Sequence, residues 1–204
     1  MKIQKRTKSV ICLAVVIVVI TVAAIRFNKL NSFFNENYGI SYAEYGMNEI
    51  VDFGEDLINF ELLSGYSIRI DDAHIIDYEE YVDFLGVTRS NLTETNPPEK
   101  VCIVAATIFN EYSDAQGVFL PYITLYGVDF FTDWNSELID LANPVLDGAL
   151  GIALSPCTSY TVYIVYNLRE DQFTSKTWDN IENEQFMLQL TQNPISKSIK
   201  LMIS

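Results

Sequence analysis

An unbroken apolar run near the N-terminus is the most distinct feature of the hydrophobic pattern. Residues 10–25 contain one polar residue, Thr21, whereas a helix on the surface of a globular domain would show a polar face. The residues before the run include four basic ones and no acid. This order directs the N-terminus inside and the remainder of the chain outside. We therefore predict a cytoplasmic basic segment over 1–9, a transmembrane anchor or signal peptide over 10–27, and an extracytoplasmic remainder.

This N-terminal segment could remain as a membrane anchor or be cleaved as a signal peptide. As a helix, the run spans about 24 Å against a hydrocarbon core of about 30 Å. Snorkelling of Arg26 and Lys29 would let the helix extend and close the gap. Cleavage after Ala24, where small residues loosely match a processing site, would instead release a secreted protein. We favour a single-pass anchor in the cell membrane.

Beyond a predicted spacer over 28–46, the pattern changes to the alternation of β-strands. Residues 67–71 place Ile68 and Ile70 on one face and polar residues on the other. Residues 101–109 are apolar on both faces, which predicts a central strand. Further strands are predicted over residues 123–131, 160–166, 185–191 and 198–203. A turn at Gln192-Asn193-Pro194 joins the last two as a hairpin.

Helices are predicted to be short and few. Residues 77–86 read as a helix that Asp77 would cap and Gly86 would end, and residues 133–141 could form a helical turn. A parallel sheet would require long crossover helices between its strands. The fold is therefore predicted to be mainly β. We expect an antiparallel immunoglobulin-like β-sandwich with one or two short helices over 47–204.

Several short motifs carry a likeness to a known family. Over Tyr45 to Ser204 the chain resembles an uncharacterised Firmicutes family of membrane-anchored proteins with an immunoglobulin-like extracytoplasmic domain of unknown function. The resemblance implies fold and location, and it transfers no catalytic role. Cys157 stands where the family pattern leads us to expect glycine. The motifs are Gly65-Tyr66-Ser67-Ile68, Asn143-Pro144-x-Leu146-Asp147-Gly148, Leu154-x-Pro156, Tyr166-Asn167-Leu168 and Lys176-Thr177-Trp178.

Charge limits the partners of the exported part. All 27 acids lie after residue 35, whereas eight of the 13 Lys and Arg lie after Phe27, so this part carries a net charge of −19. Such a charge repels nucleic acid and anionic lipid headgroups, and no nucleic-acid partner is predicted. Cys102 and Cys157 both stand near the starts of predicted strands. Antiparallel pairing of these strands would separate the two cysteines, which argues against a disulfide.

Candidate chemistry centres on His74, the only histidine. A nucleophilic triad would have to include it, and the chain has no Gly-x-Ser-x-Gly elbow. Asp72 and His74 share a strand face near Asp77 and Glu79, a pattern that could seat a divalent metal. Transition-metal sites usually need three or four ligands, often several His or Cys. We predict no catalytic residue, no metal site and no cofactor, with weak calcium binding by loop acids as an alternative.

An aromatic-rich region offers a binding surface. Its aromatic side chains could form a sugar- or peptide-binding platform, or they could belong to the core; they are Tyr122, Tyr126, Phe130, Phe131 and Trp134. Within the connection from Phe130 to Asp147 we predict a possible partner surface, because loops at the ends of a sandwich commonly carry binding residues. Alternatively this segment plugs the open end of the sandwich. The surface consists of Phe131, Trp134, Leu138 and Leu141.

These observations favour a noncatalytic module over an enzyme. We expect a membrane-anchored extracytoplasmic binding or accessory module that contacts a surface protein or peptide. An exported hydrolase or a protease-inhibitor-like effector is the alternative, and a hydrolase would show convergent carboxylates in a cleft. The pattern specifies neither the ligand nor the oligomeric state.

Overall fold

The computed structural model describes residues 21–22, 25–26, 41–59, 61–112 and 117–204. Residues Ser41–Ser204 form one compact unit. The predicted cytoplasmic segment over 1–9 and most of the predicted anchor over 10–27 lie outside the described residues. Within the described ranges, no helix is long and apolar enough to cross a membrane.

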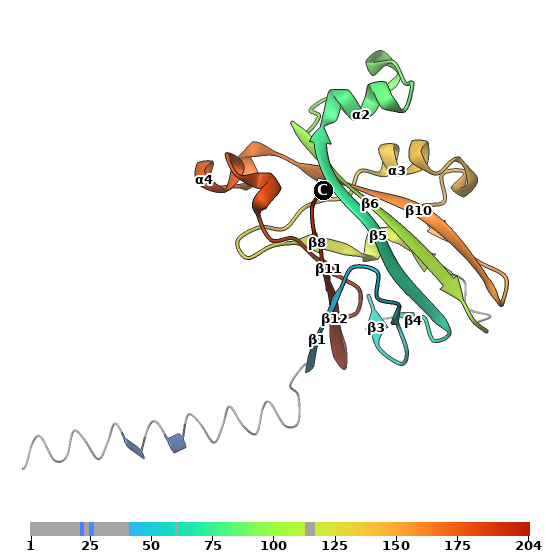
Figure 1. The fold of residues 1–204 in the computed structure, drawn as a ribbon, viewed down its shortest axis with the longest axis vertical. Helices are drawn as coiled ribbons and strands as arrows, with labels where there is room; N and C mark the ends of the chain where they lie inside the picture. Colours follow the sequence, from blue (N-terminus) through green and yellow to red (C-terminus); the bar gives the residue numbers. More distant parts are fainter. Residues whose placement is uncertain (1–20, 23–24, 27–40, 60, 113–116) are drawn as a thin grey trace, which may run out of the picture. The chain divides into compact units, whose positions relative to one another are not determined.

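The four-stranded sheet with the longer strands is antiparallel throughout and has the order β10-β6-β5-β2. Figure 1 shows its long strands β10, β6 and β5 side by side. Strand β6 is paired along its whole length with β5 on one side and with β10 on the other. Both edges of β6 are therefore paired, as predicted for a central strand. The strands are β10 (Thr158–Leu168), β6 (Lys100–Asn110), β5 (Tyr66–Asp77) and β2 (Val51–Asp52).

A β-bulge in β5 keeps its alternation in phase with the core. The register shifts between Ile70 and Asp72, so that Ile70 and Ala73 are both fully buried. The displaced Asp71 carboxylate accepts a hydrogen bond from Arg69 Nε at 2.5 Å and another from Thr107 Oγ1. The predicted strand over 67–71 is confirmed as part of β5, which contains the bulge and is twelve residues long.

The second sheet is built from short strands in the order β1-β12-β11-β8. Strand β1 runs parallel to β12, whereas the other pairs are antiparallel, so the expectation of a wholly antiparallel arrangement is wrong for this pair. Residues 41–46, assigned above to the spacer, form β1. The strand predicted over 123–131 ends at Tyr126. The C-terminal hairpin is confirmed, but its first strand is shorter than predicted and its second begins at Ile195 instead of residue 198. The strands are β1 (Ser41–Gly46), β12 (Ile195–Lys200), β11 (Met187–Gln189) and β8 (Thr124–Tyr126).

Short helices and two-stranded ribbons connect these sheets. The described part of the compact unit contains three α-helices, rather than one or two: α2 (Tyr78–Phe84), α3 (Ser136–Ala142) and α4 (Ser175–Trp178). The ribbons pair β3 (Leu57–Ile58) with β4 (Glu61–Leu62) and β7 (Val118–Phe119) with β9 (Gly151–Ile152). Single 3-10 turns are η1 (Arg89–Asn91), η2 (Leu120–Tyr122), η3 (Pro144–Leu146), η4 (Glu170–Gln172) and η5 (Ile181–Asn183).

The ends of α2 and α3 show what the sequence does and does not specify. Gly86 has a φ of 69° just beyond α2, which confirms it as the helix stop. Asp77 occupies the N-cap position but its side chain does not cap the helix. It instead pairs with Lys100 Nζ at 3.0 Å. Helix α3 has a capping residue that the sequence analysis missed, because Asn135 Oδ1 accepts a hydrogen bond from the Leu138 amide at 3.0 Å.

The two sheets share one hydrophobic core. Fully buried side chains from the long sheet include Ile68, Val104 and Ile164, and those from the short sheet include Leu125, Leu188 and Ile199. The chain is therefore mainly β, with several small sheets around a common apolar centre.

A buried ion pair connects the sheets at one end of this core. Lys197 belongs to β12, and Asp56 follows β2; their Nζ and Oδ2 atoms lie 2.7 Å apart. Lys197 Nζ also donates to the carbonyl oxygens of Asp52, at 2.6 Å, and Phe53, at 3.2 Å. Asp56 Oδ1 accepts from the Ile195 amide at 3.1 Å. The charged groups thus have hydrogen-bond partners on both sides, as burial requires.

The two cysteines of the compact unit are free. Cys102 is buried at the start of β6, and Cys157 is exposed just before β10. Because β6 and β10 are antiparallel, these positions lie at opposite ends of the pair. Cys157 has a φ of 63°, the left-handed conformation that favours glycine. The position where the family pattern leads us to expect glycine therefore has a glycine-type turn.

Candidate functional site

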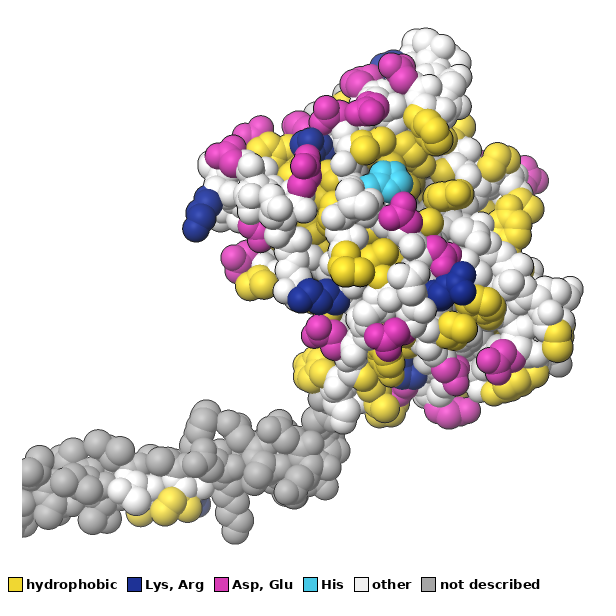
Figure 2. Space-filling view, in the orientation of Figure 1, with side chains coloured by type: hydrophobic (Ala, Val, Ile, Leu, Met, Phe, Trp, Pro, Cys, Tyr) yellow, Lys and Arg dark blue, Asp and Glu magenta, His cyan; other side chains and the backbone are white. Residues whose placement is uncertain are grey.

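A largely apolar groove lies on the outer face of the long sheet, between α2 and the end of α3. It has a volume of about 570 Å³. In Figure 2 the histidine lies among hydrophobic side chains on this face of the molecule. We call it the α2–α3 groove, and it is lined by Asp72, His74, Tyr81, Phe84, Leu85, Ile103, Ala105, Ala142 and Tyr163.

Strand register determines the floor of the groove. Ala105 in β6 lies between Asp72 in β5 and Tyr163 in β10, and His74 is opposite Ile103. These residues point away from the core because the intervening residues of each strand point into it. Ala105 is smaller than its cross-strand neighbours, so the sheet surface has a depression at this point.

Helix α2 supplies an aromatic wall. The rings of Tyr81 and Phe84 are stacked with centroids 6.2 Å apart. Tyr81 is buried, whereas Phe84 is 80% exposed. Burial raises the pKa of Tyr81 to about 12, so its hydroxyl is neutral at physiological pH. The wall therefore presents one rigid buried ring and one ring that is available to a partner.

Asn143 fixes the opposite wall. Its Nδ2 donates to the carbonyl oxygens of Ile139, at 2.6 Å, and Tyr163, at 2.7 Å. Its Oδ1 accepts from the Tyr163 amide at 2.8 Å. This buried amide occupies the place that a neighbouring strand would take at the edge of β10. The Asn143-Pro144 motif is therefore a structural device that positions Ala142 beside Tyr163.

The polar rim does not assemble a metal site. His74 Nδ1 lies 3.6 Å from Asp72 Oδ2, whereas Asp77 pairs with Lys100 and Glu79 lies 3.8 Å from Arg89. The four residues that the sequence places close together therefore do not converge. In the part of the chain that the structure describes, no group of three His, Cys, Asp or Glu side chains could hold a metal ion. The His74–Asp72 pair can offer hydrogen bonds at the edge of the groove.

The predicted partner surface is divided between different environments. Phe131 and Trp134 are exposed, whereas Leu138 is buried in the core and Leu141 packs against it. Trp134 lines a small hollow with Glu94 and Glu137, among others. Phe131 lines a separate groove on the short sheet. The four residues thus do not form one surface, and Leu138 has the buried position expected of a plug.

The aromatic platform is also divided. Tyr126 and Phe131 line the same groove. Phe130 instead packs against Phe173 and Phe186 with ring centroids 4.7 and 5.0 Å apart. The adjacent residues Phe130 and Phe131 therefore differ in environment: Phe130 is half-buried and packs against the core, whereas Phe131 is exposed.

Of the residues that line the α2–α3 groove, sequence reasoning singled out Asp72 and His74 and missed the exposed rings of Phe84 and Tyr163. A signal was present, because residues 101–109 are apolar on both faces, and both faces must then be covered or be available for binding. The pattern cannot identify which residues surround the second face, since α2 and β10 come from distant parts of the chain.

Comparison with known proteins gives one match. The sequence profile of a domain of unknown function, DUF5028, matches residues 42–197, so the chain belongs to this family. Neither the curated proteins nor the solved structures yield a match.

Proposed function

We propose that this DUF5028 member is a noncatalytic binding or accessory module whose α2–α3 groove receives an apolar or aromatic side chain of a surface protein or peptide. The observation that carries the proposal is the groove itself, which is mostly apolar and has its polar groups at one side. Concave sites of this composition are the usual form of binding pockets. The proposal includes an immunoglobulin-like fold and a single-pass anchor over residues 10–27.

The exposed rings on the groove give a reason for binding. Phe84 is 80% exposed and Tyr163 is 43% exposed. Full burial of a Phe side chain contributes about 1.5–3 kcal/mol. A partner that covers Phe84 would therefore gain stabilisation from a ring that the isolated domain leaves in water, as hot-spot aromatics do at interfaces.

Crosslinking tests the groove directly in cells. A photoreactive phenylalanine analogue replaces Phe84 in the full chain, and the same analogue replaces Leu62 as a control. Leu62 is 51% exposed in β4 and does not line the groove. We expect a discrete crosslinked species from position 84 and none from position 62. Equal crosslinking at both positions would contradict a specific role for the groove.

The proposed cellular location can be tested separately. With the N-terminus inside and residues 45–204 outside, protease added to intact spheroplasts should digest the domain. Complete protection would contradict the extracytoplasmic location. Appearance of the chain in the medium, shortened at Ala24, would favour the secreted alternative.

A polar hollow is the candidate site for the alternative function, an exported hydrolase. It has a volume of about 540 Å³ and is lined by Glu99, Glu170 and Asp171 together with Arg169. Paired carboxylates are the usual apparatus of glycoside hydrolysis. If the chain hydrolyses a glycan, a Glu170→Gln/Asp171→Asn variant should lose that activity. On the binding proposal the same variant retains full crosslinking at position 84.

A further inference from the structure

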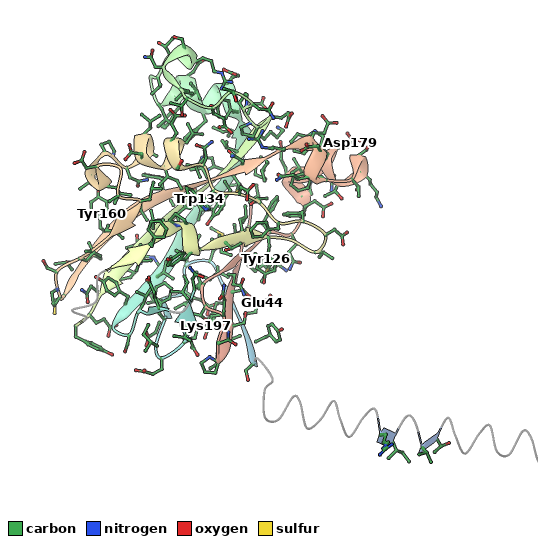
Figure 3. All side chains as sticks on the ribbon, turned by 180° about the vertical axis from the view of Figure 1, so that it is seen from behind. Glu44, Tyr126, Trp134, Tyr160, Asp179 and Lys197 are labelled. Carbon is green, nitrogen blue, oxygen red and sulfur yellow. The ribbon has the colours of Figure 1, made fainter. Side chains whose placement is uncertain are left out.

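A second groove lies on the outer face of the short sheet, separate from the α2–α3 groove. It has a volume of about 500 Å³. Figure 3 views the molecule from behind, with Tyr126 and Glu44 labelled. We call it the aromatic groove, and it is lined by Tyr42, Thr124, Tyr126, Phe131, Gln189, Gln192 and Ser196.

The register of the short sheet explains why these side chains share one face. Tyr42 in β1 is the neighbour of Ser196 in β12, and Gln189 in β11 is opposite Thr124 in β8. Tyr126 follows Thr124 by two positions and so points to the same side. The alternate residues of these strands, such as Leu125 and Leu188, are buried in the core.

A loop completes the aromatic part of the groove. A bridge between Tyr126 and Phe131 folds the chain back beside β8, and the Gly127 amide donates to the Phe130 carbonyl oxygen at 3.0 Å. This turn packs Phe130 against the core and leaves Phe131 59% exposed. Tyr42 is 82% exposed on the other side. The groove therefore has accessible aromatic rings on β1 and on the β8 side.

The lining is uncharged although the chain has a net charge of −14. Glu44 belongs to the same face of β1, but it is not among the lining residues. No lining side chain could therefore pair with a charged ligand group, and the overall charge of the protein repels anions. Anionic ligands are therefore disfavoured, whereas a neutral ligand needs no ionic partner in this groove.

Amide and hydroxyl groups lie between the rings. Gln189 Nε2 donates to Ser196 Oγ at 3.2 Å, which directs the Gln189 amide toward β12. The second Nε2 hydrogen and the Oε1 lone pairs of Gln189 could form hydrogen bonds with a ligand. The side-chain amide of Gln192 and the tyrosine hydroxyls could do the same. The groove thus alternates apolar ring faces with neutral donors and acceptors.

We propose that the aromatic groove binds a neutral oligosaccharide. A pyranose ring has an apolar face of C–H groups that can stack on an aromatic ring, and hydroxyl groups at its edge that match amides and hydroxyls. No ionic contact is needed by such a ligand. Because the groove is open and shallow, binding is weak for a single sugar and grows with the number of sugars that lie along it.

The test uses the full chain in a sugar-free detergent, since alkyl glycoside detergents would compete. Cellohexaose and chitohexaose are the probes, and saturation-transfer NMR measures contact with their ring protons. Both are tested at about 10 mM, which populates sites with millimolar Kd. We expect saturation transfer to at least one neutral oligosaccharide. We also expect an at least tenfold loss of affinity, about 1.4 kcal/mol, in Phe131→Ala and in Tyr42→Ala.

Phe84→Ala is the matched control, because it removes an exposed aromatic ring from the long-sheet face and should leave oligosaccharide binding unchanged. Phe131 and Tyr42 are largely exposed, so their variants should keep the wild-type melting temperature. Gln189→Ala provides a further variant that removes the amide and keeps the rings, and it should weaken binding as well. Absence of transfer to both probes overturns the proposal, as do unchanged binding in Phe131→Ala and tighter binding of anionic hexagalacturonate. None of these results affects crosslinking at position 84, so the two proposals can fail separately.

Discussion

The two sheets of this domain are held together by different interactions. Strands β5, β6 and β10 are eleven or twelve residues long and pair along their lengths, with one β-bulge in β5. The strands of the other sheet are three or six residues long and are supplemented by side-chain bonds. The Lys197 amide donates to Thr191 Oγ1 at 3.0 Å, and Thr191 Oγ1 donates to the Ile195 carbonyl oxygen at 2.7 Å.

This contrast extends to the outer faces. The face of the long sheet has helices on it, and the α2–α3 groove is what they leave uncovered. On the short sheet, the groove is formed mainly by side chains of the strands themselves, and these side chains alternate with residues that point into the core. The long sheet is thus held mainly by repeated backbone pairing and apolar burial, whereas the short sheet depends on a few specific polar contacts.

The largest effect should come from breaking the buried pair that holds the short sheet. Asp56→Ala leaves Lys197 buried without its counter-charge, and such a change costs about 3–5 kcal/mol. Chemical denaturation of the two proteins measures the difference in free energy of unfolding. Asp77→Ala, which removes the exposed partner of Lys100, is the control and should cost less than about 1 kcal/mol. Equal costs for both variants would contradict the special role of the buried pair.

Alkaline pH should destabilise the domain through weakly acidic side chains that are buried in α2 and in the long sheet. Burial raises the pKa of Tyr81 and of Cys102 to about 12 and raises that of Tyr166 well above its usual range. In the unfolded chain Tyr81 loses its proton near pH 10, but in the folded domain it does so only near pH 12. The unfolded state therefore binds fewer protons in this window, and stability falls as the pH rises from about 10 to 12.

Tyr81→Phe tests this pH effect because it removes one titrating group and keeps the ring. The decline in stability between about pH 10 and 12 should become shallower by about 1–3 kcal/mol. Thermal unfolding of both proteins across this pH range gives the comparison. Identical pH profiles would show that burial does not hold back ionisation at Tyr81.

The smallest effect concerns the turn before β10. Cys157 has a φ of 63°, which is unfavourable for a residue with a Cβ atom. Cys157→Gly should therefore raise the free energy of unfolding by about 0.5–1 kcal/mol. Cys157→Ala keeps the Cβ and should give no gain, which separates the backbone effect from loss of the thiol. A stabilising Ala variant together with a neutral Gly variant would reverse this interpretation.

The sequence predicts the long sheet better than the short one for a physical reason. Strands β5, β6 and β10 repeat their alternation often enough to be recognised, and Gly86 marks the end of α2. The three residues of β8 offer little periodicity, and β1 is joined to β12 in a pairing that no local pattern predicts. The two grooves are harder still to predict from the sequence. Phe84 and Tyr163 come to line the α2–α3 groove, and Tyr42 and Phe131 the aromatic groove, only after distant segments have packed together.

Filling the α2–α3 groove gives the most direct test of the binding proposal. Ala105 lies on the groove floor, so Ala105→Trp should occupy the space that a partner side chain needs. Crosslinking from the photoreactive residue at position 84 is measured in this variant and in Ala153→Trp, which adds the same ring at an exposed position outside the groove. We predict that Ala105→Trp abolishes the crosslinked species at an unchanged melting temperature, while Ala153→Trp retains it. Full crosslinking in a folded Ala105→Trp protein would contradict the proposal that the α2–α3 groove receives a partner.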